Sequence, residues 1–234
     1  MTISSDFLRE RNLIKHFRYI LYLYVFIGYC LAEAGSYEDF FQAVRVDDAD
    51  TVTALLERGF DVNTPDASSS YALAIALSAA SARVVQLLLH WPATHVDQRN
   101  ANDETPLMMA ALAGNLGVAQ ALIAKDADVN KPGWAPLHYA ATHGHLEVMQ
   151  LLLDHHAYID AESPNGTTPL MMAALYGTPQ AVKLLLQAGA DPLLINQQHL
   201  SALDFAKSGS RDESEALLSA ALRTRGAQET PSKP

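Results

Sequence analysis

The chain has 234 residues, of which 49% are hydrophobic and 18% are charged, a balance that argues against broad disorder. It carries 16 Lys and Arg against 26 Asp and Glu, a net charge of −10. An acidic balance of this kind leaves no electrostatic footprint for a phosphate backbone, which argues against nucleic-acid binding.

The N-terminal segment differs from everything after it. Basic residues come first, an almost unbroken apolar run follows over residues 19–32, and Ala32-Glu33-Ala34 then matches A-x-A. This layout is typical of a secretory signal peptide, so we expect residues 1–34 to be cleaved off after Ala34. The alternative is an uncleaved inner-membrane anchor. A helix over the apolar run would rise only about 21 Å, however, against a hydrocarbon core of roughly 30 Å.

The next part of the chain repeats one pattern six times. Three copies, over residues 105–130, 135–160 and 168–193, align without a gap, and looser copies flank them. The anchor leucines recur at spacings of 30, 33 and 33 residues: Leu107, Leu137, Leu170 and Leu203. The predicted repeats lie near 37–66, 67–100, 101–130, 131–163, 164–196 and 197–222. We expect residues 223–234, which are rich in Pro, Gly and polar side chains, to be a disordered tail.

Each unit predicts two short helices and an outward turn. A threonine can cap the first helix, and a proline suits its first position, as in Thr105-Pro106 and Thr168-Pro169. Three equivalent glycines are expected to end the first helix with a positive φ: Gly114, Gly144 and Gly177. One unit cannot bury its apolar face alone, whereas stacked units share a linear core.

The order T-P-L, A-A, Gly, L-L-L and A-D-V-N over residues 105–193 resembles the ankyrin repeat. The resemblance implies an all-α solenoid of about six repeats in an L-shaped stack, each a helix-turn-helix with a β-hairpin finger. First helices and fingers would line a concave face, and second helices would form the convex back. The domain would cover residues 35–222.

Five of the nine histidines lie close together and raise the question of a metal site. The resemblance places His138 in the T-P-L-H motif and His145 after the turn glycine, so both are expected to be framework residues. His155 and His156 fall at the end of a second helix, and only His143 is expected to face the concave side. Zinc needs three or four ligands around one point, and these side chains are expected at opposite ends of a helix pair. No metal site is predicted.

The chain contains no G-x-S-x-G, no Gly-rich phosphate loop and no H-E-x-x-H. We therefore expect no catalytic residue, no cofactor and no enzyme activity. The alternative is a hydrolase or metal-binding protein that uses His143, His145 and Asp154.

If the function is recognition, the informative residues are those that the repeat pattern leaves free. Candidate partner-binding residues before the turn glycine are Leu112, Ala113, Thr142, His143, Leu175 and Tyr176. Candidates at the finger tips are Asn102, Glu104, Lys131, Trp134, Asn165, Thr167, Gln197 and Gln198. One methionine of each pair, Met108-Met109 and Met171-Met172, is expected to pack in the core.

One linker is shorter than the others. Only Lys131-Pro132-Gly133 separates Asn130 from Trp134, which accounts for the 30-residue spacing. We expect a notch between the third and fourth repeats with Trp134 at its edge, because Trp is frequent at binding hot spots. It would form a partly apolar patch with Leu112, His143, Leu175 and Tyr176, rimmed by Glu104 and Lys131. Alternatively, Trp134 only covers the shortened hairpin.

The sequence therefore predicts a monomeric, non-catalytic protein–protein interaction module that is exported to the periplasm and has no membrane contact after cleavage. The resemblance to exported bacterial ankyrin proteins implies support or protection of an envelope enzyme, such as one of peroxide defence. An immunity protein that occludes a toxin or a lipase is the alternative. A membrane-anchored scaffold is a third hypothesis, if residues 1–34 are retained.

Overall fold

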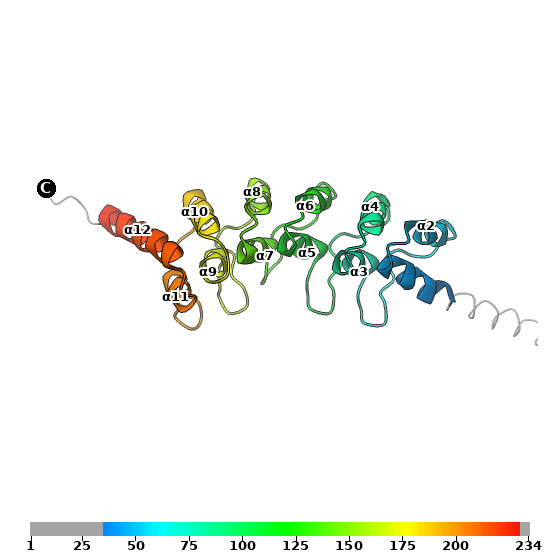
Figure 1. Cartoon of the computed structure of the whole chain (residues 1–234), viewed down its shortest axis with the longest axis horizontal. Coiled ribbons are helices and arrows are strands. Elements are labelled where there is room, and N and C mark those ends of the chain that lie inside the picture. Colours follow the sequence, from blue (N-terminus) through cyan, green and yellow to red (C-terminus); the bar gives the residue numbers. More distant parts are fainter. Residues whose placement is uncertain (1–34, 230–234) are drawn as a thin grey trace, which may run out of the picture.

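The computed structural model describes residues 35–229 as a linear stack of helix pairs, with first helices in one row and second helices in another (Figure 1). Residues 35–45 form the first helix of the first pair. The later first helices are α3 (Ala72–Ser78), α5 (Pro106–Leu112), α7 (Pro136–His143), α9 (Pro169–Leu175) and α11 (Ala202–Ser208). The second helices are α2 (Ala49–Glu57), α4 (Ala82–His90), α6 (Leu116–Ile123), α8 (Leu146–Asp154), α10 (Pro179–Ala188) and α12 (Asp212–Glu229).

This architecture confirms the all-α repeat solenoid. The described residues contain no β-strand, and two of the expected hairpins appear only as isolated antiparallel bridges, Pro65 with Tyr71 and Ile195 with Ser201. Within residues 35–229, no helix combines the length and the apolar character needed to cross a membrane.

The helix starts follow the local chemistry of the sequence. The Thr105 hydroxyl accepts the Met108 N–H at 3.3 Å, and the Thr168 hydroxyl accepts the Met171 N–H at 3.4 Å. The proline after each threonine lacks an N–H that the first turn would leave unpaired. The short helices are therefore delimited by their own residues.

The core runs along the stack between neighbouring repeats. The leucines at equivalent positions in three first helices, Leu107, Leu137 and Leu170, are fully buried. Met108 and Met171 are also buried, which confirms that one methionine of each pair packs in the core. The linear core agrees with the expectation that each repeat buries the face of the next.

The turn glycines are required for different structural reasons. Gly114 and Gly144 have φ of +66° and +69°, as expected, but Gly177 does not adopt a positive φ. A Cβ at Gly177 would instead lie 2.4 Å from the Ala141 carbonyl oxygen in α7. The predicted reason for this glycine was wrong, because its position requires close approach of two helices rather than left-handed backbone.

Four of the loops that precede first helices are closed by the same backbone hydrogen bond. The N–H at the start of each loop donates to the carbonyl oxygen four residues later, at 2.7 to 3.0 Å, over 66–70, 100–104, 163–167 and 196–200. Figure 1 shows these loops extending below the first helices, whereas the loop before α7 is short. The missing length leaves a gap in the row of fingers at α7.

The end of the chain differs from the prediction. Residues 223–229 continue α12 and are not a disordered tail. Arg, Ala, Gln and Glu in this segment have high helix propensity, and Arg225 forms an ion pair with Asp191 in the loop after α10. Residues 230–234 and the predicted signal peptide, 1–34, lie outside the described residues.

Candidate protein-binding face

His138 is a framework residue, as predicted. Its Nδ1 accepts the N–H of Ala135 at 3.1 Å, and its Nε2 donates to the carbonyl oxygen of Thr167 at 2.9 Å. Burial lowers the pKa of His138 below its usual value. The neutral ring therefore ties the start of α7 to the loop before α9.

His145 has a similar role, but it links its repeat to the preceding one. Its Nε2 donates to the carbonyl oxygen of Leu112 at 3.0 Å, across the boundary between two repeats. The ring of the exposed His143 is nearly parallel to it, with centroids 5.7 Å apart. No group of three or more His, Cys, Asp or Glu side chains with the spacing of a metal site occurs in the described part of the chain.

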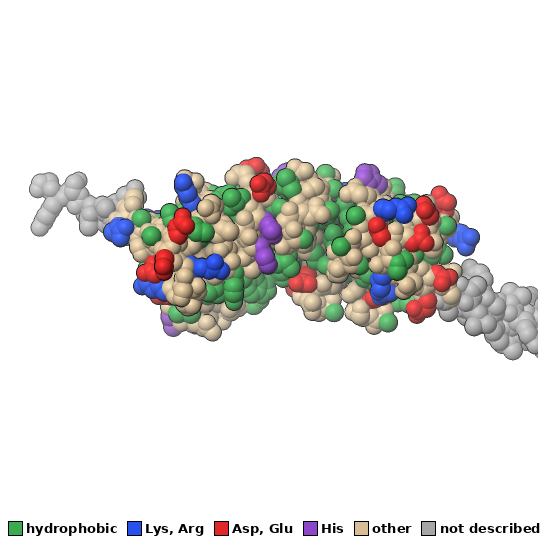
Figure 2. Space-filling model, viewed as in Figure 1, with side chains coloured by type: hydrophobic (Ala, Val, Ile, Leu, Met, Phe, Trp, Pro, Cys, Tyr) green, Lys and Arg blue, Asp and Glu red, His purple; other side chains and the backbone are tan. Residues whose placement is uncertain are grey.

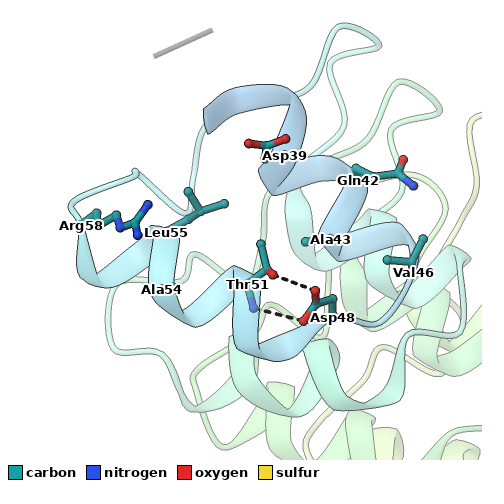
Figure 3. Close-up of a pocket in the computed structure, with 9 residues that line it drawn as sticks. All are labelled: Asp39, Gln42, Ala43, Val46, Asp48, Thr51, Ala54, Leu55 and Arg58. Atoms are coloured by element: carbon teal, nitrogen blue, oxygen red, sulfur yellow. Dashed lines mark hydrogen bonds between the residues drawn. The ribbon is translucent and has the colours of Figure 1, made fainter. Parts of the chain in front are cut away.

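A pocket of about 380 Å³ lies at the N-terminal end of the stack, between helix 35–45 and α2 (Figure 3). The carboxylate of Asp48 points into this region, but it caps α2 by accepting the N–H of Thr51 at 3.1 Å and its hydroxyl at 2.7 Å. The Asp48 carboxylate is therefore used to start α2, and the other polar side chains around the pocket are Asp39, Gln42 and Arg58.

A second pocket, of about 240 Å³, lies where the finger is short. It is open to solvent and lined from α5, α7, α9 and the loop before α7 by Leu112, Trp134, His138, Tyr139, Thr142 and Met172. Three of these, Leu112, Trp134 and Thr142, are predicted binding residues that the fold brings together. Figure 2 shows hydrophobic side chains gathered on the underside of the stack below α7 and α9, in the same region.

Trp134 is held in place by the short loop. It directly precedes the N-cap of α7, and its ring meets the ring of His138 edge-on, with centroids 5.2 Å apart. Gly133 before it has a φ of +83°. Since both nitrogens of His138 are bonded to backbone, the indole rests on a fixed support.

Glu104 stands at the edge of this pocket. One of its carboxylate oxygens accepts the Tyr139 O–H at 3.4 Å, and the other accepts the side-chain N–H of Asn100 at 2.9 Å. Burial and the nearby Glu104 charge raise the pKa of Tyr139 to about 12, so the phenol stays neutral.

Two predicted finger-tip residues are not on the surface. Lys131 is only 4% exposed, because its side chain turns inward and its ammonium pairs with Asp103 of the preceding finger. Thr167 is 2% exposed, and its N–H binds the Ser163 hydroxyl at 3.0 Å. The expectation that these side chains project from finger tips is wrong. The short loop places Lys131 against the preceding finger, and the backbone N–H of Thr167 closes the loop before α9.

The other predicted residues lie on the surface or partly so. Tyr176 and His143 are exposed, and Leu175 is half-buried. The backbone oxygens of Leu175 and Tyr176 accept the Arg211 guanidinium at 3.0 and 3.3 Å. The remaining exposed candidates are Ala113, Asn102, Asn165, Gln197 and Gln198. A partner contact at these positions stays a prediction.

The sequence reasoning missed Tyr139 and Met172 as pocket residues. Both occupy the fourth position after an N-cap, where every later repeat has a half-buried apolar side chain: Ile75, Met109, Tyr139, Met172 and Phe205. That recurrence was a usable signal, because a residue repeated at one position of stacked units forms a continuous strip.

A protein-family model described as ankyrin repeats (3 copies) matches residues 40–132, 72–163 and 129–196. The chain belongs to the ankyrin repeat family. Members of this family are generally non-catalytic and bind protein partners.

Curated proteins are similar to this chain over part of its length. Neurogenic locus notch homolog protein 1 of Xenopus tropicalis is 35% identical over 134 residues, 56% of this chain and 5% of that protein. The nuclear factor NF-kappa-B p105 subunit of Gallus gallus is 33% identical over 165 residues, 68% of this chain and 17% of that protein. The chain thus spans only a small part of these curated ankyrin repeat relatives.

Two solved structures match this chain over most of its length and over nearly all of their own. An ankyrin repeat domain from Acinetobacter baumannii has a TM-score of 0.68 at 26% identity, covering 78% of this chain and 96% of that chain. A chain in the complex of a predatory endopeptidase from Bdellovibrio bacteriovorus with an immunity protein has the same score and identity, with 97% of that chain covered.

Proposed function

We propose that this ankyrin repeat protein binds a partner protein through the face formed by its first helices, with the pocket at α7 as the centre of the contact. The observation that carries the proposal is the 240 Å³ pocket that the short finger leaves open. Its walls include Trp134 and Tyr139, and aromatic side chains in partly enclosed pockets are where protein interfaces concentrate their binding energy.

The proposal extends to location. The basic, apolar and A-x-A order of residues 1–34 supports export to the periplasm. Mass spectrometry of the protein recovered from an osmotic-shock fraction tests this: a mature chain that starts at Gly35 supports export. A chain that starts at Met1 and sediments with membranes would favour a tethered scaffold instead.

Within the envelope, the proposed role is to support or protect an enzyme, for example one of peroxide defence. A second candidate is an immunity protein that occludes a toxin or a lipase, and the similarity to a chain from an endopeptidase–immunity protein complex favours it. The two roles differ in outcome, because a support protein leaves its client active whereas an immunity protein inhibits it.

Affinity capture from envelope extract tests the binding function. Wild-type protein is compared with Trp134→Ala, Tyr176→Ala and the control Tyr158→Ala, a change at a 68% exposed residue after α8 that does not line the pocket. A partner that wild type and Tyr158→Ala retain and Trp134→Ala loses supports the proposal. A partner retained equally by all variants contradicts it, and the activity of a captured enzyme with and without this protein separates the two roles.

A further inference from the structure

The pocket at α7 is small for a free small molecule. Its volume of about 240 Å³ lies below the roughly 300–1,000 Å³ of clefts that enclose drug-sized ligands, and it is open to solvent on one side. This size suits part of a larger molecule that lies across the surface and inserts one group.

The lining of the pocket selects an apolar group. The polar atoms of its side chains are largely used inside the protein: His138 spends both ring nitrogens on backbone, and the Thr142 hydroxyl donates to the His138 carbonyl oxygen at 2.8 Å. The Tyr139 hydroxyl donates to Glu104. The remaining walls are the side chains of Leu112, Met172 and Trp134, which attract hydrocarbon or an aromatic ring.

The edge of the pocket carries an uncompensated negative charge. Glu104 forms no ion pair with any Lys or Arg in the described part of the chain, and its contacts are the neutral Tyr139 and Asn100. The nearby Lys131 is committed to Asp103 and is buried. A cation that reaches Glu104 from outside would therefore meet no competing one, and the net charge of −10 favours approach of basic groups.

We propose that the pocket receives one aromatic or long aliphatic side chain from a loop of a partner protein, and that a neighbouring Lys or Arg of that loop pairs with Glu104. This inference rests on the proposed function and names the chemistry of the partner. It follows from the apolar lining, the size and the negative charge at one edge, which has no ion-pair partner in the described part of the chain.

A phage-displayed library of disulfide-closed heptapeptides, selected on the purified protein, tests the pairing of these two features. We expect the enriched sequences to place an aromatic residue or leucine next to Lys or Arg. A synthetic peptide with the most enriched sequence should bind the Thr142→Phe variant about tenfold or more weakly than wild type, because the new ring fills the pocket. The equivalent positions in neighbouring repeats hold Leu112 and Leu175, so a large apolar residue suits this place in the helix.

Three further variants complete the test, and the first of them guards against a folding artefact. Thr142→Leu, which copies the residue of the neighbouring repeats, should also weaken binding of the peptide. Circular dichroism of this variant should show an unchanged helix content. Glu104→Gln should weaken binding a few-fold and reduce its dependence on salt, since the lost contact is ionic. Glu147→Gln, on the exposed first turn of α8, is the matched control and should leave binding unchanged.

The inference would be overturned if the selection enriched no peptide. It would also be overturned if the enriched peptides bound Thr142→Phe and Thr142→Leu with the same affinity as wild type. A consensus in which the apolar residue has no basic neighbour would contradict it too. An envelope partner whose capture depends on Tyr176 and not on Thr142 would overturn the pocket as the binding site and leave only the proposal that the face of the first helices binds a partner.

Discussion

His138 donates through Nε2 to the carbonyl oxygen of Thr167 at 2.9 Å, and so links α7 to the loop that precedes α9. The direction of this bond is settled by the other ring nitrogen, because Nδ1 accepts the N–H of Ala135 and must be unprotonated. One side chain thereby closes the start of its own helix, joins two repeats and supports Trp134.

The buried imidazole predicts an acid-sensitive fold. Burial lowers the pKa of His138 below 6.5 in the folded protein, so between these two values the unfolded chain binds a proton that the folded chain refuses. The contribution is complete above pH 6.5 and is lost as the pH falls from there to the folded pKa. We expect Tm to fall on acidification through this window, and His138→Gln to lose that part of the fall while its free energy of unfolding at pH 7.5 is lower by roughly 1–3 kcal/mol. Thermal unfolding followed at several pH values checks this, and identical acid-side slopes for the two proteins would contradict it.

Gly177 and Gly117 should respond oppositely to alanine. A Cβ at Gly177 would lie 2.4 Å from the Ala141 carbonyl oxygen and 2.8 Å from that of Ala173, so Gly177→Ala must push α7 and α9 apart and lower Tm. Gly117 is the exposed second residue of α6, and a Cβ there would meet only the Asn115 Oδ1 at 3.9 Å, so Gly117→Ala should stabilise the fold by up to about 0.5–1 kcal/mol through helix propensity. Equal destabilisation by both changes, measured in urea, would argue against the close approach at Gly177.

Removing the charge of Lys131 and removing the charge of Asp103 should affect stability differently. Lys131 is buried, whereas the Asp103 side chain is 60% exposed and is also bound by Arg99. Lys131→Met leaves a carboxylate that water and Arg99 still solvate, so we expect little change in Tm. Asp103→Asn keeps a residue that tolerates the φ of +62° but leaves a buried ammonium without its counter-charge, so a clear fall in Tm is expected. The opposite order of the two Tm values would show that the pair does not act in this way.

The same pair predicts a second effect of acid. Hydrogen bonding to Lys131 lowers the pKa of Asp103 below 3.8, so its contribution to stability is present above that value and is lost as the pH falls through the folded pKa. Wild type should therefore lose more stability than Lys131→Met below pH 4, as measured by urea unfolding. Parallel curves for the two proteins would refute the linkage.

Trp134 separates a binding role from a structural one. The half-buried ring makes an edge contact with His138, a kind of contact worth about 0.5–1.5 kcal/mol, so Trp134→Ala should lower stability by about that amount. Binding of a partner should weaken about tenfold or more, and Trp134→Phe should recover part of the affinity. A large loss of thermal stability with unchanged affinity would mean that Trp134 only covers the short loop.

Much of the fold was readable because its rules are local. The hydroxyl–proline pairs that start α5 and α9 act within a few positions of themselves. His138 and His145 were assigned to the framework from the resemblance to ankyrin repeats, and their rings bond to carbonyl oxygens in neighbouring repeats. A period of about 33 residues then indicates that these local units stack. The short linker before Trp134 was also visible as a missing length, and the structure has a pocket beside it.

The remainder depended on contacts between repeats. The repeat pattern placed Lys131 at an exposed finger tip, but only packing against the preceding finger shows that its ammonium turns inward to Asp103. The need for glycine at position 177 comes from a carbonyl oxygen in α7, 36 residues earlier in the chain at Ala141.

The sequence by itself thus determined that this chain builds repeated helix pairs and where they begin. Only the tertiary structure decided which side chains are free to meet a partner. The physical reason is that helix starts and turns depend on hydrogen bonds between near neighbours, whereas exposure at α7 depends on how adjacent repeats fill the space left by a shortened loop. Tyr139 and Met172 come together there from two different repeats.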